Sequence, residues 1–439
     1  MALIFLAAII GLLFFLHLPD YNVQKNGDVS PPTLASGLNS SNISFSKIAV
    51  DLKHNIHLIY ELNRYEYRYA RSSDLGKTWD EPENQSSKLQ NNSFSVFAGI
   101  TIIGDTVITW GRYHYSEHKP SSHGLLDINH SGLMRTISYD NGATWSTNQQ
   151  SLIEKQLNGS TLGKTEFAFY RDTLFCILEK REDSQNYGLY FSKSGDLGFS
   201  WSELITLIPP KYYNGGSPIS FCISEGILYT ALQGKTNAEA SGSIIILRST
   251  DRGETWGMLL QIYLSGNSND PSSRQYIEDL TMELLNSKLI VSLLYGYFRY
   301  YISDDNGETW QSHELKIRPA YGRLFYINNN NELNLIWIDD RNCYKDWRAY
   351  LPAPISYMMI MDGDPTWPNN DLYQQNLDKS SSKPQRLTPP YSYIRPPCFL
   401  VNDFSDSLMV MWLGRDKVNS KYEAFSEPSQ LLYKFIPNN

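Results

Sequence analysis

The chain has few cysteines, and none of them is arranged for a metal or redox centre. Its four cysteines are Cys176, Cys222, Cys343 and Cys398, and no two of them form a CxxC pair. Zinc ribbons and dithiol redox sites need such pairs, so we expect neither. In an oxidising compartment Cys343 and Cys398 could form a disulfide, while four buried free thiols are an equally good interpretation.

Positive charge is also scarce. The chain has 38 Lys and Arg against 46 Asp and Glu, which gives a net charge of −8 at pH 7. A nucleic-acid partner would require a basic surface, so we expect none. What the chain does contain is apolar and aromatic: it is 41% hydrophobic, with 30 Tyr and 10 Trp. This composition indicates a globular protein and favours β structure.

Residues 1–18 form an apolar run that lacks Lys and Arg. Its length lies between the core of a signal peptide and a full membrane span. No basic residue precedes the run and no small-x-small cleavage site follows it, so a cleaved signal and a retained membrane anchor both remain open. Either one predicts a secreted or membrane-anchored protein with the rest of the chain outside the cytosol.

We divide the chain into three parts. Residues 1–18 are the signal peptide or anchor, residues 19–43 are a linker that could supply a closing strand, and residues 44–439 are the folded domain. Six Asn-x-Ser sequons give weak support for glycosylation, because chance alone would produce a similar number. They lie at Asn39, Asn42, Asn84, Asn91, Asn129 and Asn158.

One octapeptide pattern, Ser-x-Asp-x-Gly-x-Thr/Ser-Trp, recurs along the chain. It occupies residues 72–79, 138–145, 194–201, 249–256 and 303–310, with a degenerate sixth copy at 360–367. The aspartates of the five full copies lie 66, 56, 55 and 54 residues apart, at Asp74, Asp140, Asp196, Asp251 and Asp305. A constant period of this size predicts a repeat architecture.

The carboxylates of this octapeptide are expected to hold a turn and not a metal ion. Asp and Ser side chains accept hydrogen bonds from the backbone of a turn, and Gly permits a positive φ. A calcium-binding EF-hand would need a longer loop between helices, whereas strand-like runs flank each copy. Each copy ends in a tryptophan that is expected to be buried at the start of the next strand: Trp79, Trp145, Trp201, Trp256 and Trp310. We therefore predict no metal and no cofactor.

Three strand-like runs precede each turn and a fourth follows it, which predicts tandem four-stranded antiparallel sheets. The octapeptide resembles the Asp box, or BNR repeat, of the sialidase-like β-propellers. In that family the turn joins the third and fourth strands of a blade, on the rim away from the substrate face. The resemblance covers residues 44–436. We expect an all-β propeller of seven blades, with six as the alternative; the seven blades would begin near Phe45, Phe94, Lys164, Ser217, Tyr276, Tyr321 and Tyr391.

The resemblance places the binding face at the starts of the first strands and at the loops between second and third strands. The largest such loop is residues 111–132, which we expect to be mobile and solvated. A metal site built from its His114, His118, His123 and His130 with Glu117 and Asp127 is the less favoured alternative. Four arginines directly follow apolar strands: Arg112, Arg181, Arg341 and Arg415. They would suit a carboxylated sugar, or they could bridge neighbouring blades.

Sialidase chemistry, as the resemblance implies it, needs an arginine clamp for the carboxylate, a Tyr nucleophile with a Glu base, and an acid. Tyr391 matches the nucleophile and Glu278 the base, and Arg64 and Glu66 match a clamp-side residue and the acid. Two clamp positions depart from the family: Lys47 replaces an Arg, and the position near Leu294 and Tyr295 has none. Arg341 could be the third clamp residue.

The prediction from the sequence is therefore an extracytoplasmic propeller that recognises a glycan or glycoprotein with altered catalytic motifs. A divergent exo-sialidase that uses Tyr391, Glu278 and Glu66 is the first alternative, and a protein-binding scaffold is the second. The sequence alone does not choose a sugar, a partner or an oligomeric state.

Overall fold

The structure is a computed structural model. Among the residues that it describes, every regular element but one short 3₁₀ helix, η2 (Pro210–Tyr212), is a β-strand. The all-β prediction is confirmed. The structure describes residues 33–34, 43–62, 66–85, 94–121, 124–146, 161–181, 187–213, 218–234, 243–263, 279–295, 297–315, 319–339, 371–388, 393–401, 407–415 and 430–437.

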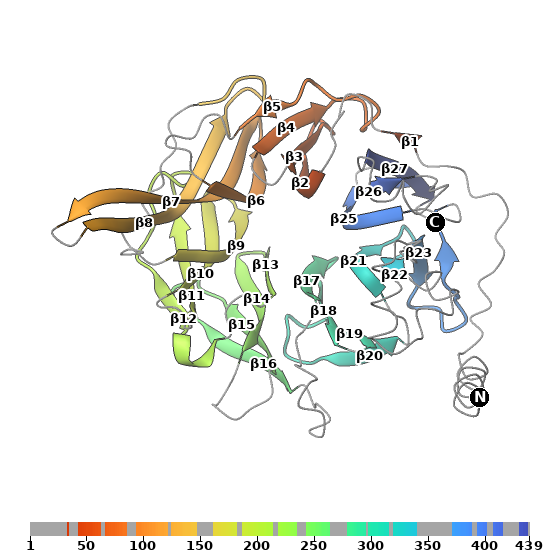
Figure 1. The fold of residues 1–439 in the computed structure, drawn as a ribbon. Coiled ribbons are helices and arrows are strands. Elements are labelled where there is room, and N and C mark those ends of the chain that lie inside the picture. The colour runs from red at the N-terminus through yellow and green to blue at the C-terminus, as the bar shows by residue number, and fades with distance from the viewer. Residues whose placement is uncertain are drawn as a thin grey trace, which may run out of the picture. The chain divides into compact units, whose positions relative to one another are not determined.

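Residues 35–317 form one compact unit with five antiparallel sheets that follow one another in chain order (Figure 1). Within each sheet the strands are also paired in chain order. The strands of the five sheets are β2 (Ile43–Val50), β3 (Ile56–Leu62), β4 (Glu66–Ser72) and β5 (Glu83–Asn84); β6 (Phe94–Ile103), β7 (Thr106–Ser121) and β8 (Gly124–Ser138); β9 (Thr161–Tyr170), β10 (Thr173–Arg181), β11 (Tyr187–Ser194) and β12 (Ile205–Ile208); β13 (Ile219–Ser224), β14 (Ile227–Gly234), β15 (Ser243–Ser249) and β16 (Gly257–Tyr263); β17 (Asp279–Leu285), β18 (Lys288–Tyr295), β19 (Tyr297–Ser303) and β20 (Gln311–Leu315).

The second compact unit combines residues 1–34 with residues 318–439 and holds two further sheets. The last of these sheets takes its fourth strand from the N-terminal side of the chain, since Thr33 of β1 lies opposite Tyr433 of β27. The strands are β21 (Pro319–Ile327), β22 (Leu333–Asp339), β23 (Asp371–Asn376) and β24 (Gln385–Arg386); β25 (Tyr393–Val401), β26 (Ser407–Arg415), β27 (Gln430–Pro437) and β1 (Thr33–Leu34).

The sheets have the size and strand order of β-propeller blades. Six of them have four strands, which matches the alternative count of six blades. The sheet β6-β7-β8 has three strands among the described residues and begins at Phe94, one of the seven predicted starts.

The core lies between neighbouring sheets. Trp110 of β7 stacks on Phe167 of β9 at 5.0 Å between ring centroids, and Trp201 packs edge-on against Trp110 at 6.0 Å. Similar clusters of buried apolar residues join β9–β12 to β13–β16, β13–β16 to β17–β20, and β21–β24 to β25–β27. In each of these pairs the two sheets bury apolar side chains against each other.

The five Asp boxes lie where they were predicted, at the end of the third strand of each sheet in residues 35–317. In every box the Ser hydroxyl donates to the Asp carboxylate at 2.7–2.9 Å and accepts the amide of the Gly at 2.7–2.8 Å. The Asp also accepts the backbone amide and the hydroxyl of the Thr or Ser. These bonds lower the pKa of Asp140, Asp251 and Asp305 to about 2. The carboxylates therefore hold turns, as predicted.

A cation near the end of the third strand reaches the next Asp box in four successive pairs of sheets, a link that the sequence pattern did not predict. The guanidinium of Arg71 donates to the carbonyl of Asn141 at 3.0 Å, and that of Arg248 donates to the carbonyl of Asn306 at 3.1 Å. Arg135 and Lys193 make the same kind of bond to Leu197 and Arg252. All four acceptor residues have a positive φ. The boxes therefore link consecutive sheets as well as shaping turns.

The expectation of an open loop at residues 111–132 was wrong. Strands β7 and β8 stay paired along this segment as far as Ser121 opposite Gly124, and they extend as a two-stranded ribbon beyond the end of β6 (Figure 1). Pairing satisfies the backbone donors and acceptors of both arms with each other, which a solvated loop would leave to water. Among the predicted metal ligands of this segment, the backbones of His114, Glu117, His118, Asp127 and His130 lie in β7 and β8, and His123 falls outside the described residues.

Candidate functional site

The first strands of the sheets in residues 35–317 contact one another in sequence: β2 contacts β6, β6 contacts β9, β9 contacts β13, and β13 contacts β17. Three of these strands carry a register shift in their first half. The shift lies between Ile43 and Ser46 in β2, between Phe97 and Gly99 in β6, and opposite Glu179 of β10 in β9. Bulges of this kind re-aim side chains and are frequent beside functional sites.

The bulge of β9 brings Lys164 close to Glu179 of β10. Leu162 lies opposite Lys180 and Thr165 opposite Leu178, so Gly163 and Lys164 together face Glu179 of β10. Glu179 is buried and its carboxylate accepts the backbone amide of Lys164 at 3.0 Å. A Cβ atom at Gly163 would overlap this carboxylate, so the close approach requires glycine at that position.

Arg112 of β7 is fastened to the same bulge. Its guanidinium donates to the carbonyl of Gly163 in the next sheet. Burial lowers the pKa of Arg112, and this effect is opposed by Tyr67, Glu179 and Glu166. Arg112 thus makes a bond from one sheet to the next, which is the bridging arrangement given above as the alternative to sugar binding.

Glu166, two residues beyond the bulge, is surrounded by cations. The Lys47 ammonium of β2 lies 4.0 Å from the Glu166 carboxylate, and their side chains are 51% and 34% exposed. Burial raises the pKa of Glu166, while Lys47, Lys164 and Arg112 act to lower it. The pKa of Glu166 is raised overall, because the loss of contact with water has a larger effect than the three nearby positive charges.

Lys164 and Tyr213 complete the surroundings. Burial lowers the pKa of Lys164, opposed by Glu179 and Glu166, while Arg112 lowers it further. Burial, with a contribution from Glu179, raises the pKa of the Tyr213 hydroxyl. We call Lys47, Arg112, Lys164, Glu166 and Glu179 the first-strand cluster. It combines three cations with two carboxyl groups, one of which holds its proton more tightly than usual, and so it can bind an anion and exchange a proton.

The other residues predicted for the site are placed as follows. The Arg181 guanidinium lies over the ring of Tyr187 at 5.7 Å, at the end of β10. The backbones of Glu66 and Arg415 lie in β4 and β26, opposite Leu62 and Tyr393. Four predicted residues fall outside the described part of the chain: Arg64, Glu278, Arg341 and Tyr391. The structure therefore places Lys47 and Arg112 near the same carboxyl group, that of Glu166, and does not test the proposed catalytic set.

Sequence reasoning missed Lys164, Glu166 and Glu179 as site residues. The signal was the alternation of charged and other residues at the start of a first strand, "GKTEF" at residues 163–167, and a lone Glu in the apolar run of β10. Alternation alone would place these charges in solvent. Only the contacts between first strands show that they meet.

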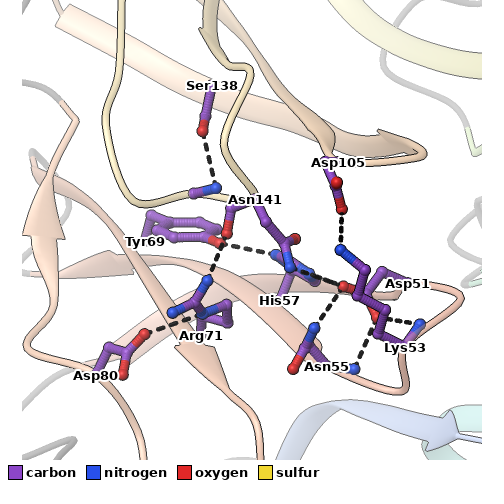
Figure 2. A network of polar contacts seen from close by, with 11 residues as sticks. Asp51, Lys53, Asn55, His57, Tyr69, Arg71, Asp80, Asp105, Ser138 and Asn141 are labelled. Carbon is purple, nitrogen blue, oxygen red and sulfur yellow. Dashed lines mark hydrogen bonds and ion pairs between the residues drawn. The ribbon is translucent and has the colours of Figure 1, made fainter.

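A second polar cluster lies at the contact between the first two sheets (Figure 2). His57 of β3 is fully buried; its Nδ1 lies 2.7 Å from the Tyr69 hydroxyl and its Nε2 lies 3.4 Å from the Asp51 carboxylate. Burial lowers the pKa of His57, although Asp51 acts to raise it. Asn141 of the second Asp box donates its side-chain amide to Asp51 at 3.0 Å. Because His57 has no exposed surface, we interpret this cluster as a structural link between sheets.

Comparisons with known proteins agree with the repeats. The family model described as "BNR/Asp-box repeat" matches residues 301–312. A curated sialidase of Clostridium perfringens is 25% identical over 272 residues, which cover 55% of this chain and 65% of the sialidase. The chain thus spans less than two thirds of the length of that relative.

Solved structures with a similar backbone fold include a protein of unknown function and an enzyme. A protein of unknown function from Dyadobacter fermentans aligns with a TM-score of 0.48 and 11% identity, over 94% of this chain and 99% of that one. An intramolecular trans-sialidase from leech aligns with a TM-score of 0.42 and 12% identity, over 94% of this chain and 70% of the enzyme.

Within the ranges given above, no helix has the length and apolar character needed to cross a bilayer. In the same residues, no group of three or more His, Cys, Asp or Glu side chains is arranged around a common point as metal ligands would be.

Proposed function

We propose that this sialidase-like Asp-box β-propeller recognises a glycan, and that the first-strand cluster supplies part of the binding site. The observation that carries the proposal is that cations from strands of three different sheets lie near one carboxyl group. The Lys47 ammonium is 4.0 Å from the Glu166 carboxylate, Lys164 is two residues before Glu166 in β9, and Arg112 bonds to the Gly163 carbonyl of the same strand. Three cations from three sheets make a locally positive site in a chain whose net charge is −8. Such a site attracts an anionic ligand.

The chemistry of the cluster favours a sugar that carries a carboxylate. Lysine ammonium groups bind carboxylates as point charges, and Arg112 is already engaged with the Gly163 carbonyl. We therefore assign the ligand contacts to Lys47 and Lys164 and a supporting role to Arg112. The predicted leader at residues 1–18 supports a site of action outside the cytosol, where glycans of this kind are displayed.

A glycan array tests the proposal. The wild-type protein is expected to bind acidic glycans, and Lys47→Ala and Lys164→Ala are each expected to weaken that binding at least tenfold. Lys288→Ala is the matched control, because it removes a lysine that pairs with Asp304 at 2.7 Å outside the cluster. Binding that survives both cluster substitutions would place the site elsewhere.

Hydrolysis of a sialoside is the second candidate, favoured by the sequence identity with the curated sialidase. It would use Tyr391 as nucleophile, Glu278 as its base and Glu66 as acid. A fluorogenic sialoside assay decides it: turnover that disappears in Tyr391→Phe supports an enzyme. Absence of both turnover and glycan binding would leave the protein-binding scaffold.

A further inference from the structure

The first-strand cluster contains its own competitor for an anionic ligand. The Glu166 carboxylate lies 4.0 Å from the Lys47 ammonium, and the Lys164 and Arg112 charges also act on it. A ligand carboxylate that paired with Lys47 would stand within a few ångströms of Glu166. Two carboxylates at such a distance do not both remain ionised at a modest energetic cost.

We propose that binding of a carboxylated sugar displaces the Glu166 carboxylate as the partner of Lys47 and is coupled to the uptake of one proton by Glu166. This inference rests on the proposed function and names how that site is regulated. When Glu166 is ionised, its carboxylate pairs with the nearby cations and repels the carboxylate of the ligand. When Glu166 is protonated, the cations can pair with the ligand instead, and the Glu166 hydroxyl can donate a hydrogen bond to it.

The groups around Glu166 are consistent with such a role. The charged groups that face it are Lys47 from β2, Arg112 from β7 and Lys164 from β9, and the buried Cys176 thiol of β10 lies close enough to be affected by its charge. Glu179 and Asp279 act to raise the pKa of Lys164, and Tyr67 acts to raise the pKa of Arg112. The Glu179 carboxylate accepts the backbone amide of Lys164, which holds this side chain in place beside the bulge.

The direction of the pKa of Glu166 agrees with this geometry. Burial already raises the pKa in the free protein, and a bound carboxylate would raise it further. Between these two pKa values the ligand-bound protein holds a proton that the free protein has lost. Linkage then requires the dissociation constant to rise by about tenfold per pH unit across that interval.

The experiment is a titration with two acidic probes, an α-glycoside of N-acetylneuraminic acid and glucuronic acid, with galactose as the neutral control. For the wild-type protein we expect the dissociation constant to rise by up to about tenfold per pH unit above the free-site pKa. Glu166→Gln should bind at least as tightly at low pH and lose this dependence. Glu314→Gln removes an exposed carboxylate of β20 that pairs with Arg299, and this variant should keep the pH dependence of the wild-type protein.

Proton uptake by the wild-type protein provides a test that does not depend on a variant. Calorimetry in buffers of different ionisation enthalpy should show about one proton taken up per probe bound within the sensitive interval. Binding of either probe without proton uptake, or with an unchanged pH dependence in Glu166→Gln, overturns the inference and leaves the proposed function standing. Failure of wild-type protein and Glu166→Gln alike to bind any acidic glycan overturns both.

Discussion

The side-chain amide of Asn141 donates to the carboxylate of Asp51 at 3.0 Å, although the two residues are 90 positions apart in the chain. The carbonyl of the same Asn141 accepts a bond from Arg71 at 3.0 Å. The second Asp box is thus held to the first sheet through both the side chain and the backbone of one residue (Figure 2). Contact between sheets depends on such paired bonds as well as on apolar packing.

Asn141→Ala is expected to destabilise the protein by about 1–3 kcal/mol, because the buried Asp51 carboxylate loses a donor. Asn306→Ala is the matched control. Asn306 stands at the same position of the fifth box and also has a positive φ, so alanine brings similar backbone strain to both sites. Denaturant unfolding measures the difference; equal losses in the two variants would mean that the bond to Asp51 contributes little.

The Asp51–His57 pair predicts that stability falls on acidification. Burial acts to raise the pKa of Asp51, but hydrogen bonds from Asn55, Asn141 and His57 bring it from 3.8 to about 2. Burial lowers the pKa of His57 from 6.5. Both groups therefore hold fewer protons in the folded state than in the unfolded state, which stabilises the fold at neutral pH.

The loss of stability on acidification should come in two steps. The contribution of His57 is complete above about pH 6.5 and falls below it, and that of Asp51 falls as the pH passes from 3.8 toward 2. The midpoint of thermal unfolding, measured from pH 7.5 downward, should decline first below about pH 6.5. His57→Gln should reduce the slope of this first decline, and an unchanged slope would assign it to other groups.

Ser194→Ala is expected to cost about 1–3 kcal/mol, because it leaves the buried amide of Gly198 without its acceptor. Ser200→Ala in the same box removes only an exposed hydroxyl that donates to Asp196, so its effect should be much smaller. Thermal unfolding of the two variants compares them directly. If they were equally destabilised, the buried serine would not be the residue that fixes the turn.

Gly163→Ala should both destabilise the protein and disturb the first-strand cluster. The new methyl group would overlap the Glu179 carboxylate, at a cost of about 1–3 kcal/mol for overpacking. Displacement of Glu179 should also weaken binding of the acidic probes. Gly257→Ala is the control, since a Cβ atom there meets nothing within 4 Å; equal stability in the two variants would argue against the tight contact at Gly163.

Local patterns allowed much of the fold to be predicted. The Ser-x-Asp-x-Gly-x-Thr-Trp turn is built from hydrogen bonds within eight residues, so its sequence specifies its structure wherever it occurs. The spacing of the turns then fixes the number of strands between them, which is why Phe94 was recognised as the start of β6. The segment at 111–132 was misjudged because whether two arms pair with each other depends on their register and not on composition.

The sequence by itself determined the Asp boxes, the strand pattern and the repeat of the sheets, because each depends on residues close together in the chain. Only the tertiary structure decided that Glu166 meets Lys47 from β2 and Arg112 from β7. The pKa of Glu166 depends on burial and on charges brought from distant strands, and neither quantity exists until the sheets pack together.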